Sequence, residues 1–290
     1  MVRLIITSLL IFMCLLEGYS KDLNEYAGRA DSLFNEGAYQ EASIEFERLA
    51  YQATSNTERT IAIVRKSDCL VALSNFHSAK SNLLRINYFS LNDSIVFEAR
   101  FKTAYSAYLD EDFSLANNQM FLIRQYLPEI YHRKSTTLYA LSLNEDRSWT
   151  EAHELLIADL AKRSIPQHEK DSIIQELNSA YNEKDFPKYR DPEKAKNLSS
   201  VLPGLGQLYA GYPQDAAFTW FFLAAGLATG AYTAFVFRYF VTGLSIWGGI
   251  GERLYSGGVR RSAFLAEKKN YNTARRYNDS LKMLILQLNY

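Results

Sequence analysis

Apolar and small positions in the first half of the chain follow a long repeat. An aromatic residue three positions before an alanine recurs at Tyr39 with Ala42, Phe76 with Ala79, Phe113 with Ala116 and Trp149 with Ala152. Successive alanines are 37, 37 and 36 residues apart, and a large apolar residue follows each one four positions later, at Phe46, Leu83, Met120 and Leu156. A further apolar residue follows in three copies, at Leu49, Ile86 and Ile123. A small residue stands twelve positions before each alanine, at Ala30, Ser67, Ala104 and Ala140. This spacing predicts helical hairpins, because the small residues let two antiparallel helices approach closely.

The pattern resembles the tetratricopeptide repeat, which has small, apolar, alanine and aromatic positions in this order. In the best copy, Leu23–Ser55, Gly37 takes the turn between the helices, and Pro128 takes the closing proline position of the third copy. The family's full tryptophan, leucine-glycine and tyrosine set is incomplete in every copy, and the period exceeds the family's value of about 34 residues. The resemblance implies an all-α solenoid of about four hairpins over 21–185, capped by a helix at 166–184. The alternative is an unrelated helical bundle.

The resemblance also implies a binding surface. In the family the first helix of each pair lines a concave face that holds peptides. Carried over to this chain, the lining residues are Asp31, Asn35, Asp68, Tyr105, Tyr108, Lys134 and Asn144. Such a groove is acidic and aromatic at its centre, so tyrosines supply rigid contact area and carboxylates attract basic segments. The alternative is that these residues are ordinary solvated positions.

The N-terminus has the features of a signal peptide over residues 1–20. Arg3 is followed by a 13-residue apolar run, Leu4–Leu16, that is too short for an ordinary membrane span. Small residues precede a cleavage point after Ser20. Met13 before Cys14 argues against a lipid anchor, and Cys69 is then the lone thiol, which excludes a disulfide framework. The alternative is an uncleaved anchor.

A second apolar region predicts a membrane hairpin over 199–257, after a charged linker at 186–198. Ala216–Phe237 is 22 residues without charge, or about 33 Å of helix. Arg238 and a further 13 uncharged residues follow, too few for a second full span unless the helix continues to Tyr255. Gly226 and Gly230 form a G-x-x-x-G pair of the kind that packs membrane helices together. The alternative is a buried hairpin of a globular domain.

A glycine-rich motif precedes this hairpin, with the residues Pro203, Gly204, Gly206, Gln207, Tyr209 and Gly211. It resembles small helical membrane domains of bacterial envelope proteins that share a P-G-x-G-Q core, an uncharacterised group that implies no activity. The motif lacks the third glycine of a dinucleotide loop and the lysine-serine of a P-loop. We expect its glycines to permit a bend where the chain enters the membrane, with Gln207 and Tyr209 at the interface.

The last segment, 258–290, is predicted to be a basic amphipathic helix. Its apolar stripe contains Ala274, Tyr277, Leu281, Leu284, Ile285 and Leu288. Such a helix can lie on anionic lipid or dock on the acidic repeat domain.

The two halves of the chain also differ in charge. The chain has 32 basic and 32 acidic residues, but 21–198 holds 22 basic against 27 acidic and 199–290 holds 9 against 4. An acidic body with a basic, apolar tail is unlike a nucleic-acid binder and fits a soluble module beside a membrane. The scattered His132, His153 and His168, with no nucleophile–base pair, predict neither an enzyme nor a metal or cofactor site.

These observations predict a membrane-anchored scaffold of the bacterial envelope that binds a protein or peptide partner through its repeats. We expect the inner membrane with the repeats in the periplasm, because outer-membrane proteins usually cross as barrels. The alternative is an accessory subunit of a transport or assembly system in which the hairpin is the working part. The sequence leaves the partner and the oligomeric state open.

Overall fold

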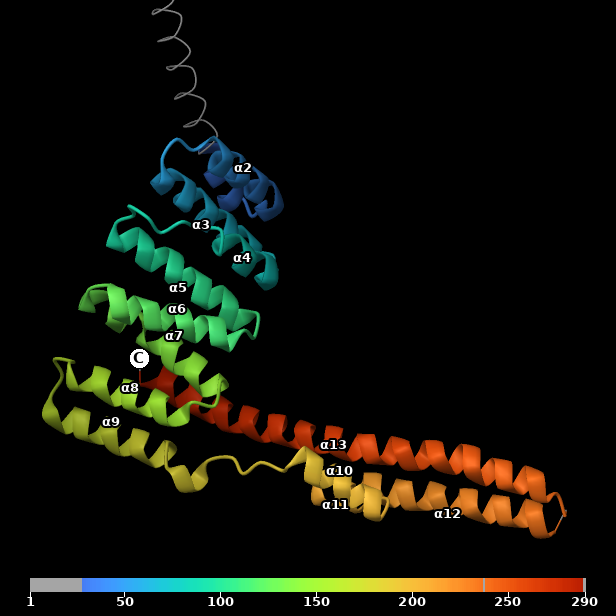
Figure 1. The fold of residues 1–290 in the computed structure, drawn as a ribbon. Coiled ribbons are helices and arrows are strands. Elements are labelled where there is room, and N and C mark those ends of the chain that lie inside the picture. The colour runs from blue at the N-terminus through green and yellow to red at the C-terminus, as the bar shows by residue number, and fades with distance from the viewer. Residues whose placement is uncertain (1–27, 237, 289–290) are drawn as a thin grey trace, which may run out of the picture. The chain divides into compact units, whose positions relative to one another are not determined.

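The computed structural model describes residues 28–236 and 238–288, and every element in this part of the chain is a helix (Figure 1). The prediction of an all-α protein is confirmed. The predicted signal peptide and Cys14 lie outside the described residues. The described residues up to Leu177 belong to one compact unit, here called the repeat unit, and Asn178–Gln287 form a second, here called the hairpin unit.

The repeat unit begins with a helical segment at residues 28–35. The helices that follow are α2 (Tyr39–Gln52), α3 (Asn56–Ala72), α4 (Phe76–Leu83), α5 (Asp93–Leu109), α6 (Phe113–Tyr126), α7 (Glu129–Glu145), α8 (Trp149–Ala161) and α9 (Gln167–Ala180), the last of which crosses into the hairpin unit. From α2 to α8 each helix packs against the next in the chain, and α5 also contacts α3 and α7.

The repeated sequence positions explain these helices. The four aromatic residues are the first residues of α2, α4, α6 and α8. The alanine three positions later is fully buried in every copy, at Ala42, Ala79, Ala116 and Ala152. The small residues of the preceding helices are at most 1% exposed, at Ala30, Ser67, Ala104 and Ala140. The predicted helix pairs are therefore present, with small side chains where two helices approach closely.

Each pair closes with the same turn, although only the first copy has a glycine there. The turn residues have left-handed backbone angles, with φ values of 82°, 57°, 58° and 67° at Gly37, Ser74, Glu111 and Arg147. In each copy the next N–H donates to the carbonyl oxygen five residues back, at Ala38 to Leu33, Asn75 to Leu70, Asp112 to Ala107 and Ser148 to Leu143, over 2.8–2.9 Å. These bonds satisfy carbonyls that a helix end leaves unpaired.

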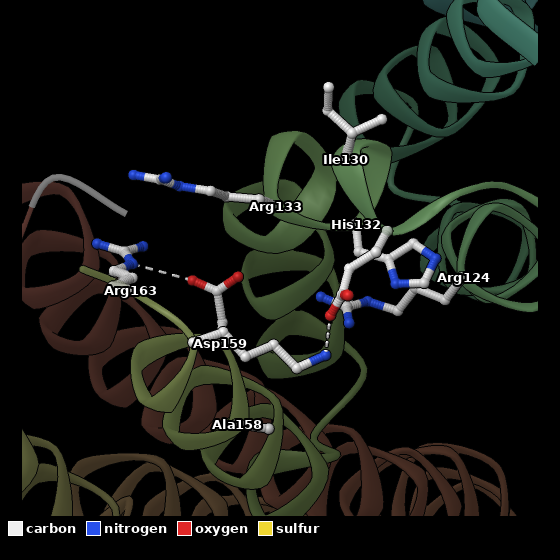
Figure 2. A pocket seen from close by; sticks show the side chains of 9 residues that line it. Arg124, Ile130, His132, Arg133, Ala158, Asp159 and Arg163 are labelled. Atoms are coloured by element: carbon white, nitrogen blue, oxygen red, sulfur yellow. Dashed lines mark hydrogen bonds and ion pairs between the residues drawn. The ribbon is translucent and has the colours of Figure 1, made fainter.

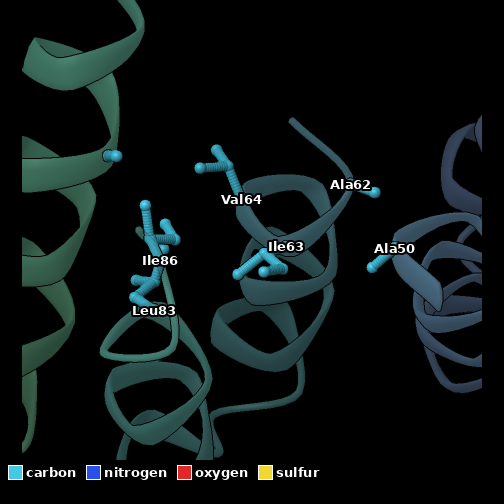
Figure 3. Packing of buried hydrophobic residues seen from close by; sticks show 7 residues of the cluster. Ala50, Ala62, Ile63, Val64, Leu83 and Ile86 are labelled. Carbon is cyan, nitrogen blue, oxygen red and sulfur yellow. The ribbon is translucent and has the colours of Figure 1, made fainter. Parts of the chain in front are cut away.

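Apolar side chains from consecutive helices meet between the copies. Figure 3 shows one such cluster, in which Ile63 of α3 lies between Ala50 of α2 on one side and Leu83 of α4 and Ile86 on the other. A second cluster joins α5, α6 and α7 around Met120. The core is thus a series of similar contacts along the chain.

The hairpin unit contains η1 (Glu183–Asp185), α10 (Pro192–Val201), α11 (Leu205–Tyr209), α12 (Pro213–Phe235) and α13 (Phe240–Gln287). Helix α10 begins inside the predicted linker, because Asp191 accepts bonds from the N–H groups of Glu193 and Lys194 and Pro192 suits the first turn. Helices α10, α11 and α12 all pack against α13.

Helix α13 differs from the prediction. The sequence divided this region into a membrane hairpin over 199–257 and a separate basic helix over 258–290, but one helix of 48 residues runs through the boundary. An internal glycine costs a helix about 1 kcal/mol. Packing of α13 against α12 and α10 along its length outweighs that cost.

Candidate functional site

Asp31 and Asp68, the two carboxylates of the predicted groove, belong to one chain of ion pairs. Arg65 contacts Asp31 at 2.6 Å and Asp68 at 3.8 Å. Lys102 contacts Asp68 at 2.6 Å and Glu98 at 3.3 Å. These pairs join the segment 28–35, α3 and α5 across one face. The carboxylates that were expected to attract basic segments are therefore already neutralised within the repeat unit.

The other groove residues fall into different environments. Asn35 and Lys134 are exposed, and Tyr105 is 41% exposed. Tyr108 is half-buried and packs edge-on against Phe113, with 5.8 Å between the ring centroids. Asn144 is 2% exposed, so its side chain is not part of a binding surface. Of this set, Tyr105 is the aromatic residue best placed to contact a partner.

An open pocket that the sequence did not predict lies where α6 and α8 end and α7 begins (Figure 2). Its volume is about 500 Å³. The lining residues are Arg124, Glu129, Ile130, His132, Arg133, Ala158, Asp159, Lys162 and Arg163. We call it the α6–α8 pocket.

Asp159 occupies the centre of this pocket and breaks the repeat. Its position in the other copies holds Leu49, Ile86 and Ile123. Asp159 is nonetheless buried, and its Oδ2 accepts a bond of 3.0 Å from Arg163 Nε while its Oδ1 accepts one of 3.0 Å from the Thr136 hydroxyl. A carboxylate at a position where the other copies have an apolar side chain is the kind of departure that functional sites favour.

Arg124 faces the same cluster from α6. Its Nη2 donates to the Thr136 hydroxyl at 2.9 Å, and its guanidinium lies 5.8 Å from the Tyr139 ring centroid. Its Nε is buried and has no hydrogen-bond partner among the described residues. Burial lowers the pKa of Arg124, and the charge of Asp159 opposes that shift. Among the described residues, a hydroxyl group and an aromatic ring hold the Arg124 guanidinium. Its remaining N–H groups can therefore bind an anionic group.

The rim of the pocket carries further charges. Lys162 forms an ion pair with Glu129. Figure 2 also shows Arg133 on the same side of Asp159 as Arg163, with His132 beside Arg124 on the other side. With two of the four cations paired to the two carboxylates, Arg124 and Arg133 give the pocket a positive balance.

In the hairpin unit, the glycine motif forms the crossing point of the helices. A Cβ added to Gly206 would lie 1.9 Å from the Ala195 carbonyl oxygen and 2.7 Å from Ser262 Cβ. The N–H of Gly206 donates to Ser199 Oγ at 3.0 Å. Only glycine therefore allows α11 to pass this close to α10 and α13. Gly204 and Gly211, with φ of 95° and 86°, form the turns on either side.

Gln207, which was predicted at a membrane interface, lies within this helix crossing. Its side chain is fully buried. Its Oε1 accepts a bond of 3.1 Å from Ser199, and its Nε2 donates to Thr219 Oγ1 at 3.3 Å and to the Gly258 carbonyl at 3.1 Å. The amide thus joins α10, α11, α12 and α13, and its role is to fix their crossing.

Tyr209, the other residue expected at the interface, lies on the α10 side of this crossing. Its hydroxyl accepts the N–H of Asp191 at 3.1 Å, and the charged groups of Arg190 and Lys194 lie 5.3 and 5.4 Å from its ring centroid. The ring is half-buried. Tyr209 therefore helps to hold the start of α10.

Helix α12 leaves most of its apolar surface uncovered. Its 23 residues have a mean hydropathy of 1.3 in the most apolar stretch, of which 6% is buried, and length and composition would let it cross a membrane. Phe218, Phe221 and Phe235 are each more than 60% exposed. The predicted packing through Gly226 is not seen, because a Cβ there would meet nothing within 4 Å, although Gly230 is buried.

No family model, curated protein or solved structure matches this chain. The two family resemblances, the groove and the absence of catalytic, metal and cofactor sites therefore stay predictions.

Proposed function

We propose that this protein is a membrane-anchored adaptor of the bacterial envelope, in which a solenoid of helical repeats binds a protein or peptide partner. The observation that carries the proposal is the uncovered apolar helix α12, whose most apolar stretch is only 6% buried, in the same chain as a polar, fully helical repeat unit. Aromatic and aliphatic side chains exposed at this density are unfavourable in water and favourable in lipid.

The partner is proposed to bind the repeat unit. Tyr105 offers exposed aromatic area beside the ion pairs of Asp68 and Lys102. The α6–α8 pocket adds Arg124, whose guanidinium lacks a direct carboxylate partner among the described residues. These features favour a partner that combines an apolar or aromatic contact with an anionic group.

In this proposal the repeat unit lies in the periplasm and is anchored at the inner membrane, because the sequence predicts an export signal and a membrane hairpin. Anchoring to a surface and binding through the repeats act together, because confinement raises the effective concentration of the partner.

The alternative, a membrane accessory subunit, has one feature in its favour. Gly226, Gly248 and Gly249 leave open space on the hairpin, with nothing within 4 Å of an added Cβ. Small faces of this kind accept another membrane helix.

The proposal is tested by crosslinking the full chain in cells and purifying it in detergent. Tyr105→Ala and Arg124→Gln are compared with Arg59→Ala, an exposed arginine of α3 outside both surfaces. Tyr105 is preferable to Tyr108, because loss of Tyr108 would also disturb its packing on Phe113. A partner captured by the full chain and by Arg59→Ala, but lost from Tyr105→Ala or Arg124→Gln, supports the adaptor. A partner captured by all variants, through residues 199–290 alone, would favour the accessory subunit.

A further inference from the structure

A crevice at the base of the α12–α13 hairpin combines apolar walls with two arginines. Its volume is about 370 Å³. Phe218, Phe222 and Leu223 of α12 line one side, and Arg253 and Arg261 of α13 line it with Tyr255 and Gly258. The apolar and cationic side chains are close together, as an amphiphilic ligand requires.

We propose that this crevice binds the phosphate headgroup of an anionic phospholipid. The inference rests on the membrane anchoring proposed above, and it adds a specific lipid site to it.

The two arginines retain donors for an oxyanion. Arg261 contacts a single carboxylate oxygen, Asp215 Oδ1, through Nε at 2.7 Å and Nη2 at 2.5 Å. A guanidinium has five N–H donors, so this pair leaves others available. Arg253 is exposed and forms no ion pair with any described carboxylate, and the neighbouring Glu252 does not line the crevice. Two cations against one carboxylate give the crevice a net positive charge that complements a phosphate.

Side chains around the crevice have the pattern of a membrane–water boundary. The Trp220 indole donates to the Pro203 carbonyl at 2.5 Å, and the Tyr255 hydroxyl donates to the Ser200 carbonyl at 2.6 Å. Their polar atoms are thus bonded to the last turn of α10 and to the segment that follows it, while 43% and 39% of their surfaces are exposed. Rings of this kind lie at headgroup level in membrane proteins.

The end of α10 also supplies apolar contact. Val201 is 84% exposed and Leu202 is 50% exposed, directly beside the carbonyls that Tyr255 and Trp220 contact. The phosphate of a lipid at this level would reach Arg253 and Arg261, and its glycerol and acyl carbons would lie along Phe218 and Phe222. A free phosphate would leave those apolar walls uncovered, so the walls favour a lipid.

The test uses the full chain and vesicles of phosphatidylcholine, with or without phosphatidylglycerol, followed by native mass spectrometry of retained lipid. Arg253→Gln removes one cation, and Asp215→Asn with Arg261→Gln removes the ion pair without leaving a charge unpaired. Arg276→Gln is the control, because this exposed arginine of α13 lies outside the crevice and its loss changes net charge equally. We expect retained phosphatidylglycerol to fall about tenfold in Arg253→Gln, as loss of a charge-assisted contact predicts, and less than about twofold in the control.

The outcomes separate this site from the anchor. Equal losses in Arg253→Gln and Arg276→Gln would show a diffuse charge effect and overturn the site. Vesicle binding without preference for phosphatidylglycerol would overturn the site and leave the anchor standing. A chain that stays in solution with both vesicles would overturn the anchor and the site together.

Discussion

The two units of this protein achieve close helix packing in opposite ways. In the repeat unit the same contact is made four times, with a buried alanine from each copy at Ala42, Ala79, Ala116 and Ala152. In the hairpin unit close packing depends on one motif, in which Gly206 and Gln207 meet three other helices.

This difference indicates which parts of the chain tolerate substitutions. A repeated contact can vary in each copy, as the turn residues Gly37, Ser74, Glu111 and Arg147 show by holding the same backbone conformation. A unique crossing has no copy that could compensate for its loss, so single substitutions there carry the full cost.

The largest effect is expected from Gly206→Ala. The added Cβ would lie 1.9 Å from a backbone oxygen of Ala195, so helices must separate rather than a side chain rotate. We expect the hairpin unit to lose more than about 3 kcal/mol, which is at the upper end for overpacking. Thermal unfolding of the full chain in detergent, followed by proteolysis of α10–α13, measures the loss.

Gly226→Ala is the matched control. Its Cβ meets nothing within 4 Å, and alanine favours a helix over glycine by about 1 kcal/mol. The same substitution should therefore leave the hairpin unit as stable as before or slightly more so. Equal losses at both glycines would show that helix propensity, and not the close crossing, determines the effect.

Asp159→Leu tests the one buried carboxylate that breaks the repeat. It restores the apolar residue of the other copies but removes the carboxylate that Arg163, whose side chain is mostly buried, contacts at 3.0 Å. Breaking such a pair from one side costs about 3–5 kcal/mol. Urea unfolding of the full chain should show a loss at the lower end of this range.

Replacing both partners should reverse that loss. Asp159→Leu with Arg163→Met removes the two charges together, and apolar replacements of buried pairs are often neutral. If the single and double variants are equally unstable, Asp159 contributes through packing and the ion pair does not explain its burial.

An ion-pair cluster between the second and third copies predicts a pH dependence. Lys80 contacts Asp110 at 2.7 Å and Asp112 at 2.9 Å. The hydrogen bonds from Lys80 lower the pKa of both carboxyl groups. A carboxyl whose pKa is lowered by folding adds stability above its ordinary pKa, near about 4, and this stability is lost as pH falls through the folded-state value.

Lys80→Met should therefore lower the free energy of unfolding by up to about 1 kcal/mol at neutral pH, a value typical of partly exposed pairs. The difference from the unaltered chain should shrink as the pH falls below about 4, because protonated carboxyl groups no longer attract Lys80. Unfolding curves at several pH values measure this, and a difference that is constant with pH would contradict the ion-pair explanation.

Structural features that depend on residues near one another in the chain could be predicted from the sequence. Features that depend on contacts between distant residues could not. The aromatic and alanine spacing correctly predicted that this part of the chain is helical, because helical periodicity is local. The hydrogen bonds of Gln207 were not predicted, because its partner Gly258 lies 51 residues away. One feature of the sequence could have indicated the α6–α8 pocket: the fourth copy has Asp159 where the other three copies have an apolar residue.

The smallest effect is expected at the turns, where it tests whether the repeat unit tolerates variation as argued above. Glu111 is exposed and has a φ of 58°, a conformation that costs a residue with a Cβ about 1–2 kcal/mol and glycine nothing. Glycine also loses more entropy on folding, so Glu111→Gly should raise the free energy of unfolding by about 0.5–1 kcal/mol.

Glu154→Gly is the control for this turn, because Glu154 is exposed within α8 and glycine there should destabilise by about 1 kcal/mol. Gly37→Ala should likewise destabilise the equivalent turn of the first copy, whose φ is 82°. Opposite signs for Glu111→Gly and Glu154→Gly in urea unfolding would show that backbone conformation sets the effect. The same sign at both positions would mean that the turns are not equivalent, and the repeat unit would then depend on individual residues as the hairpin unit does.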